Sequence, residues 1–203
     1  MGFFGYFKKG IELAMLKGDA ADEVASDPES FVPALVIYML PSVLVAVLLV
    51  VVIQMFAGAG MAGMAGPGGL PPQAAIFIPL ISKISYGLII LLPLAALLGT
   101  LFYVGILHLV AKLFKGEGTF LDFYQTVGIG SLVSWGGILP YIGILFSLWT
   151  VVVTVVVTSR VHKLSTGKSV AVVLLPLVVL FAIGIALAIG FAAMMMGSMP
   201  THH

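Results

Sequence analysis

The sequence predicts an all-α membrane protein, a five-transmembrane-helix bundle with a short N-terminal amphipathic helix. The chain of 203 residues is 61% hydrophobic and only 8% charged, whereas a soluble domain has about a quarter of its residues charged. Its basic residues are clustered, and the sequence between the clusters is almost wholly apolar. Basic loops are retained on the cytoplasmic side of a membrane. Eight of the nine Lys and Arg residues form three islands: Lys8, Lys9 and Lys17; Lys112 and Lys115; Arg160, Lys163 and Lys168.

Residues 1–30 are predicted to form a cytoplasmic N-terminal arm with an amphipathic helix. On a helix, Phe3, Phe4 and Phe7 share one face, and Lys8 and Lys9 lie elsewhere. Such a helix can lie on the inner leaflet, where lysines are attracted to anionic lipid. It can equally pack on the loops of the protein itself, and the sequence leaves both interpretations open.

The membrane domain is expected over residues 31–199, and its first span over about 33–55. Asp27, Pro28 and Glu29 precede that span as a capping residue, a proline at the first helical position and an acid in the first turn. The next apolar stretch, 74–111, would be a helix of roughly 57 Å, too long for one crossing. We expect one span over about 84–109, because two would separate the basic islands.

Residues 74–82 then form an outer interfacial or re-entrant piece, and Lys83 marks the outer boundary. The remaining spans are expected at about 119–134, 138–158 and 170–195. Thr119 and Asp122 form a capping box that opens the third span.

A turn is predicted at Gly136–Gly137. Residues 200–203 are a tail that could be the remnant of a tag. Five crossings place the N-terminus in the cytoplasm and the C-terminus outside, in a multi-pass protein of the cell (inner, cytoplasmic) membrane.

Polar side chains inside the predicted membrane domain are few. Asp122 and Gln125 lie one helical turn apart, and His108 is a possible partner. An intramembrane carboxylate is by default a functional candidate, so these residues could line a transport path. The alternative, which the first-turn position of Asp122 favours, is helix capping. The thioethers of Met61 and Met64 suit Cu(I), but adaptable packing is the favoured interpretation. We therefore predict no cofactor, metal or enzymatic activity.

The basic islands and the aromatic arm are the candidate contact residues for lipid or a protein partner. A net charge of +1 and the absence of a basic stripe argue against nucleic-acid binding. Small residues at four-residue spacing, such as Ala182, Ala186 and Gly190, suit a tight bundle or a homo-oligomer. The candidate lipid or partner contacts are Phe3, Phe4, Phe7, Lys8, Lys9, Lys112, Lys115, Arg160, Lys163 and Lys168.

Two stretches resemble the Yip-domain family, the Ypt/Rab-GTPase-interacting polytopic membrane proteins. They are 115–143 (KGEGTFLDFYQTVGIGSLVSWGGILPYIG) and 160–176 (RVHKLSTGKSVAVVLLP), with SDPESFVPAL ahead of the first span. The resemblance implies five helices, a cytoplasmic N-terminus and a C-terminus on the far side. Eukaryotic members are linked to Rab-type GTPases, vesicle trafficking and membrane shaping, which implies a GTPase-like or membrane-protein partner. The short loops and composition are typical of a prokaryotic member.

We therefore expect a non-enzymatic membrane-organising or partner-binding scaffold. The alternative is a small transporter or channel with a polar path near Asp122 and Gln125.

Overall fold

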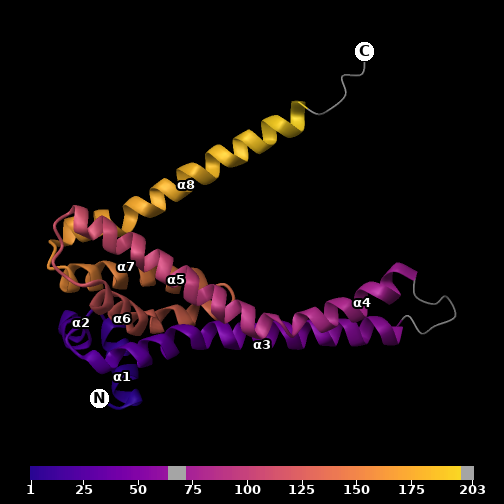
Figure 1. Ribbon diagram of the computed structural model, residues 1–203, viewed down its shortest axis with the longest axis horizontal. Helices are drawn as coiled ribbons and strands as arrows, with labels where there is room; N and C mark the ends of the chain where they lie inside the picture. The colour runs from indigo at the N-terminus through magenta and orange to yellow at the C-terminus, as the bar shows by residue number, and fades with distance from the viewer. Residues whose placement is uncertain (64–71, 198–203) are drawn as a thin grey trace.

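The computed structural model describes residues 1–63 and 72–197, which are helical and contain no strand. Met64 and the tail at 200–203 lie outside the described residues. The elements are α1 (Phe3–Ala14), α2 (Gly18–Ala25), η1 (Pro28–Ser30), α3 (Phe31–Gly63), α4 (Pro72–Ser85), α5 (Leu88–Leu113), α6 (Phe120–Gly130), η2 (Ser131–Ile138), α7 (Gly143–Val161) and α8 (Thr166–Gly197). Figure 1 shows the short helices α1, α2 and α6 gathered at one end of α3, whereas α4 lies along the other half of α3.

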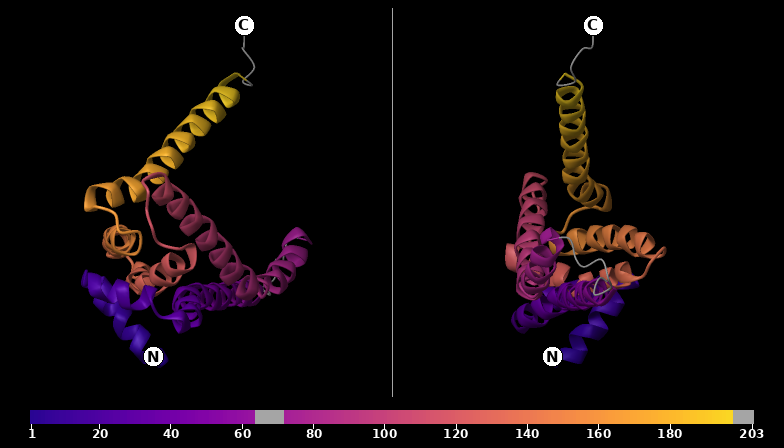
Figure 2. Two further views of the ribbon diagram at one scale, coloured as in Figure 1. Left: turned by 60° about the vertical axis from the view of Figure 1, so that its left-hand side comes forward. Right: turned by 90° about the vertical axis from the view of Figure 1, so that its right-hand side faces the viewer.

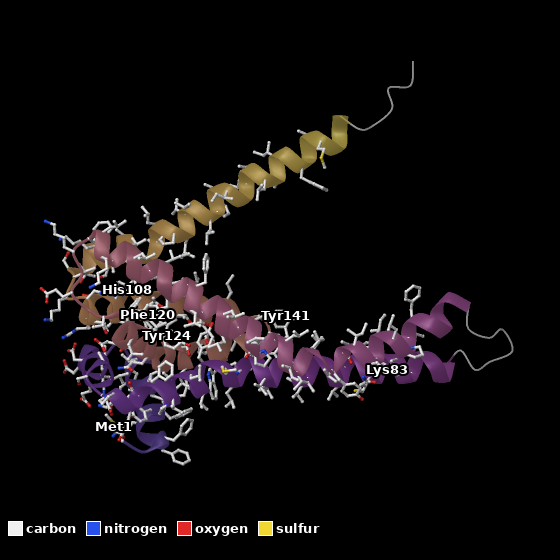
Figure 3. All side chains as sticks on the ribbon, viewed as in Figure 1. Met1, Lys83, His108, Phe120, Tyr124 and Tyr141 are labelled. Carbon is white, nitrogen blue, oxygen red and sulfur yellow. The ribbon has the colours of Figure 1, made fainter. Side chains whose placement is uncertain are left out.

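The three basic islands lie together at one end of the molecule, which we call the basic end (residues 8–17, 112–115 and 160–168). Helix α3 leaves this end, α5 returns to it, α7 also finishes there, and α8 leaves it again (Figure 1). Met1 and His108 lie at or near the basic end, and Lys83 lies far from it (Figure 3). Lys83 on α4 is thus a basic residue that stands apart from the three islands.

Helix α6 is the centre of the core. It is only 11 residues long, yet every residue from Phe123 to Gly130 is buried. It packs against α3, α5, α7 and both helices of the arm. Gly128 permits the close approach of α3, because a Cβ added there would lie 2.9 Å from the Cβ of Ala34 on α3. The predicted cap is confirmed, since the Asp122 N–H donates to Thr119 Oγ1 at 3.2 Å.

A 3₁₀ helix, η2, continues α6 and corrects the predicted turn. Gly136 and Gly137 lie inside η2, and the chain turns instead at Pro140–Ile142. Gly136 is required where it stands, because a side chain there would overlap the ring of Phe146 on α7. Glycine pairs often mark turns, but here Gly136 allows η2 and α7 to come into contact.

Four helices among the described residues are long and apolar enough to cross a membrane. The predicted count of five is therefore not confirmed. They are α5, α7, most of α8, and a segment over Pro28–Ala59 that contains most of α3. The stretch expected as the third span, 119–134, is divided between α6 and η2, and α6 alone is too short to cross.

The segment expected as an outer interfacial or re-entrant piece forms α4, which packs on the far half of α3. A polar clasp joins the two helices. Gln54 Nε2 donates to the main-chain oxygen of Ser82 at 2.9 Å and to Ser85 Oγ at 3.0 Å, and Ser82 Oγ donates back to Gln54 Oε1 at 2.6 Å. Such pairing satisfies an amide that would otherwise be costly in an apolar medium.

Helix α8 packs on α5 and α7 near its start and then extends away from the bundle (Figures 1 and 2). Figure 2 shows a bend part of the way along it, and Pro176 is the proline inside the helix, which is a sufficient cause of bending. The predicted small-residue face is unpartnered here, because added Cβ atoms at Gly184 and Gly190 would meet nothing within 4 Å.

Candidate functional site at the basic end

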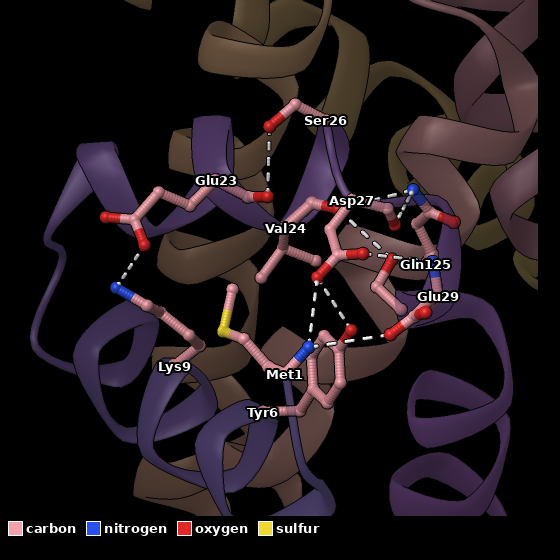
Figure 4. Close-up of polar contacts among 10 residues, drawn as sticks. Met1, Tyr6, Lys9, Glu23, Val24, Ser26, Asp27, Glu29 and Gln125 are labelled. Atoms are coloured by element: carbon pink, nitrogen blue, oxygen red, sulfur yellow. Dashed lines mark hydrogen bonds and ion pairs between the residues drawn. The ribbon is translucent and has the colours of Figure 1, made fainter.

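The arm, residues 1–30, is packed onto the bundle. Phe7 contacts Trp135 with ring centroids 5.9 Å apart, and Trp149 Nε1 donates to the main-chain oxygen of Ala14 at 2.7 Å. Tyr6 is buried and donates its hydroxyl hydrogen to Asp27 Oδ2 at 2.7 Å (Figure 4). These contacts come from three separate elements and fix the position of α1.

Ion pairs connect α2 to α1 and α7, and a hydrogen bond from Tyr6 on α1 holds Asp27, which follows α2. Lys9 Nζ lies 2.6 Å from Glu23 and 3.0 Å from Glu12 (the Glu23 pair is drawn in Figure 4), and these hydrogen bonds raise the pKa of Lys9. Arg160 lies 3.5 Å from Asp22. The hydrogen bond from the Tyr6 hydroxyl lowers the pKa of Asp27, and burial raises the pKa of Tyr6 to about 12.

Gln125 is the polar side chain that joins the arm to α6. It is buried, and its Nε2 lies 3.3, 3.2 and 3.5 Å from the main-chain oxygens of Val24, Ala25 and Asp27 (Figure 4). These oxygens belong to the end of α2 and the residues just beyond it, where carbonyls lack partners within the helix. The amide proposed for a transport path therefore caps the arm, and the polar path near Asp122 stays a prediction.

The loops after α5 and α7 pack on each other. The Glu117 N–H donates to the main-chain oxygen of His162 at 3.0 Å, and Lys163 Nζ lies 2.9 Å from the Glu117 carboxylate. This pair lowers the pKa of Glu117 and raises that of Lys163. Gly116 and Gly118 make room, because side chains there would overlap His162 and Val161. The two stretches quoted for the family resemblance thus meet in space.

Two lysines in these loops have a left-handed backbone. Lys115 has a φ of 65° and Lys163 a φ of 52°, a conformation that costs a residue with a Cβ roughly 1–2 kcal/mol. Each follows the end of its helix, where glycine is the usual residue. Backbone strain of this kind supports a functional hypothesis, and both lysine side chains are exposed.

A histidine pair lies beneath the loops. The ring centroids of His108 and His162 are 5.1 Å apart, and His162 also packs on Phe123 at 4.7 Å. His162 is fully buried, and within the described part of the chain neither of its ring nitrogens has a hydrogen-bond partner. Burial lowers the pKa of His162 to about 4, with further lowering by His108 and Lys112 and an opposing effect of Asp122. Sequence spacing alone gave no reason to pair these residues.

The predicted contact residues divide into two groups. Phe7, Lys9, Arg160 and Lys163 make the internal contacts described above. The remaining residues are exposed; Phe4 is 86% exposed, and Lys112 Nζ also donates to the main-chain oxygen of Glu117 at 3.3 Å. This outward group, which we call the outer set, consists of Phe3, Phe4, Lys8, Lys112, Lys115 and Lys168.

A cavity lies deeper in the bundle, among α3, α5, α6, η2 and α7, and most of its lining residues have hydroxyl groups. Sequence reasoning did not identify it. Its serines and threonines are spread over three segments, and each one separately has the character of an ordinary packing residue. Asp122 and Gln125 are not among the described residues that line it.

Within the described residues, no group of three or more His, Cys, Asp or Glu side chains is placed to hold a metal ion. The comparisons with known proteins give one finding: the family model of the Yip1 domain matches residues 15–188. Searches of curated proteins and of solved structures give no significant match.

Proposed function

This chain belongs to the Yip1 domain family, and from that premise we propose that it is a non-enzymatic membrane scaffold that binds an acidic partner at its basic end. The observation that carries the proposal is the docked arm. With Phe7, Lys9 and Arg160 engaged internally, the aromatic and cationic side chains of the outer set remain exposed. A negatively charged surface, either anionic lipid or an acidic protein, is complementary to them.

The proposal includes an orientation, with the basic end in the cytoplasm and five crossings. The segment α6–η2 would be the third crossing. Eleven α-helical residues rise about 17 Å and eight 3₁₀ residues about 16 Å, which together reach the roughly 30 Å of a bilayer core. Irregular backbone at membrane depth is tolerated where protein covers it, and α3 and α7 cover η2.

Cysteine labelling from outside intact cells tests this orientation. Five crossings leave Ser165→Cys unreactive and Tyr141→Cys reactive. Both sites are exposed, and Tyr141 is 99% exposed. If α6–η2 does not cross, α7 runs the other way and Ser165→Cys reacts, which would overturn the proposed map.

Lipid retention tests the basic end. Each lysine near an anionic surface contributes about 1 kcal/mol, so Lys115→Gln with Lys168→Gln should reduce retention of anionic over zwitterionic phospholipid by roughly tenfold or more, measured by native mass spectrometry. Lys83→Gln is the matched control, because Lys83 lies at the other end of the molecule (Figure 3). Equal losses in the double variant and the control would contradict lipid binding at this end.

Crosslinking in native membranes tests for the protein partner. A photoreactive residue in place of Phe4 should capture an acidic protein. The same residue in place of Phe102, which is 71% exposed on the membrane-spanning helix α5, should capture lipid only. Identical products at both positions, together with unchanged lipid retention in the lysine double variant, would refute the scaffold proposal.

A further inference from the structure

The cavity inside the bundle has a volume of about 150 Å³ and a distinctive lining. Seven of its eleven lining residues carry a hydroxyl group, and all eleven are uncharged. Three of the hydroxyl residues, Thr100, Ser131 and Thr154, are almost completely buried. These hydroxyl groups lie in an otherwise apolar membrane domain, so the polar groups of a ligand can be paired there and need not be buried without partners.

The hydrogen bonds of the lining determine what kind of ligand fits. Five Ser and Thr hydroxyls each donate their hydrogen to a main-chain oxygen three or four residues earlier, at 2.6–2.8 Å. A hydroxyl has one hydrogen and two lone pairs, so these five groups retain only acceptor capacity toward the cavity. They are Thr100, Ser131, Ser134, Thr150 and Thr154.

Two tyrosines, Tyr38 and Tyr103, complete the polar lining and bring hydroxyls that can donate as well as accept. The polar part of the lining therefore consists mainly of acceptors without formal charge, and the rest of the lining is apolar. An ion would need a compensating charge in this low-dielectric setting, and none of the described lining residues supplies one. An uncharged molecule with several O–H donors satisfies the acceptors without that penalty.

Size limits the ligand further. A cavity of about 150 Å³ accommodates benzene, a molecule of about six non-hydrogen atoms. We propose that this cavity binds an uncharged polyol group of about that size, either free glycerol or the glycerol headgroup of a neutral glycerolipid. The competing occupant is water, of which roughly five molecules would fill the same volume.

Thr→Val substitutions distinguish a loss of polyol binding from a loss of folding, because valine keeps the shape of threonine and removes the hydroxyl. The test variant is Thr100→Val with Thr154→Val. The matched control is Thr158→Val. Thr158 lies one turn along α7, is fully buried and makes the same bond to a main-chain oxygen, at 2.7 Å, but it is not among the residues that line the cavity.

The experiment uses the full-length chain purified in detergent. Equilibrium dialysis against radiolabelled glycerol measures the free polyol, and mass spectrometry of extracted lipid measures co-purified diacylglycerol. The expected result is saturable glycerol binding, or stoichiometric diacylglycerol, in wild type and in Thr158→Val. The double variant should bind the same probe at least about tenfold more weakly, since it loses two hydrogen-bond acceptors.

The two measurements identify the source of the polyol, because free glycerol and diacylglycerol are scored separately. If the double variant does not fold, Thr154→Val alone takes its place, and the wild-type measurement stands without either variant. Failure of wild type to bind both probes would overturn the proposal and leave water as the occupant. Undiminished binding in a folded double variant would also overturn it.

Discussion

Acidification is expected to destabilise the packed loops at the basic end, because His162 is buried as a neutral ring. Its pKa is about 4 in the folded protein, chiefly because of burial, against about 6.5 in an unfolded chain. Between these two values the unfolded state binds a proton that the native state does not bind. The free energy of unfolding must therefore decrease as the pH falls from about 6.5 to about 4.

The size of this effect follows from the two pKa values. Each unit of difference corresponds to about 1.4 kcal/mol, so His162 should lower the stability by about 1.4 kcal/mol at pH 5.5 and about 3 kcal/mol at pH 4. His162→Phe keeps a ring beside Phe123 and removes the titrating group. The variant should show a correspondingly shallower dependence of stability on pH.

Unfolding by SDS in mixed micelles, followed by tryptophan fluorescence, is the assay. Trp135 contacts Phe7 and Trp149 binds the main chain of Ala14, so both tryptophans report whether the arm is docked. Carboxylates with lowered pKa values, such as Asp27, also lose their contribution in acid, but they do so in both proteins and cancel in the difference. The reasoning is refuted if wild type and His162→Phe lose stability in parallel from pH 6.5 to pH 4.

Three further predictions use the same unfolding assay. Gly136→Ala should lower stability by about 1–3 kcal/mol, because its Cβ overlaps Phe146. Gly99→Ala, where a Cβ meets nothing within 4 Å, should be neutral or stabilising by up to about 1 kcal/mol. Equal changes in stability for the two glycine substitutions would contradict the close contact between Gly136 and Phe146. Gln125→Leu should cost about 1–3 kcal/mol and increase protease cleavage of the arm, and unchanged cleavage would exclude the capping role. Lys115→Gly should raise stability by about 1 kcal/mol while reducing anionic lipid retention, and a loss of stability would disprove strain at this residue.

Composition and charge predicted the class of fold because both follow from partitioning between lipid and water. The all-α membrane class, the family and the cap at Thr119 are confirmed. The count of five was not confirmed, because α6 is too short to cross a membrane by itself and the chain continues from it as the 3₁₀ helix η2. The turn prediction at Gly136–Gly137 failed because a local glycine signal cannot show that Phe146 lies against that position.

The site was harder to predict, because its properties depend on contacts between distant segments. Lys8 and Lys9 are adjacent in sequence, yet Lys9 is paired with Glu23 across the arm while Lys8 remains exposed. Nothing local distinguishes them. Gln125 has the sequence character of a polar residue in a membrane span, and only the tertiary structure shows that its amide reaches the carbonyls at the end of α2.

The winding of η2 has a consequence for the chemistry of the interior. Side chains three residues apart are eclipsed in a 3₁₀ helix, so Ser131 and Ser134 stand in one row and both line the cavity. In an α-helix the same two residues would be about 60° apart. Rewinding η2 would also shorten it by about 4 Å. The alignment of the two serines and the length of η2 therefore both depend on its 3₁₀ winding. A ligand that binds both serines would stabilise this winding, and with it the distance that the segment spans across the bilayer.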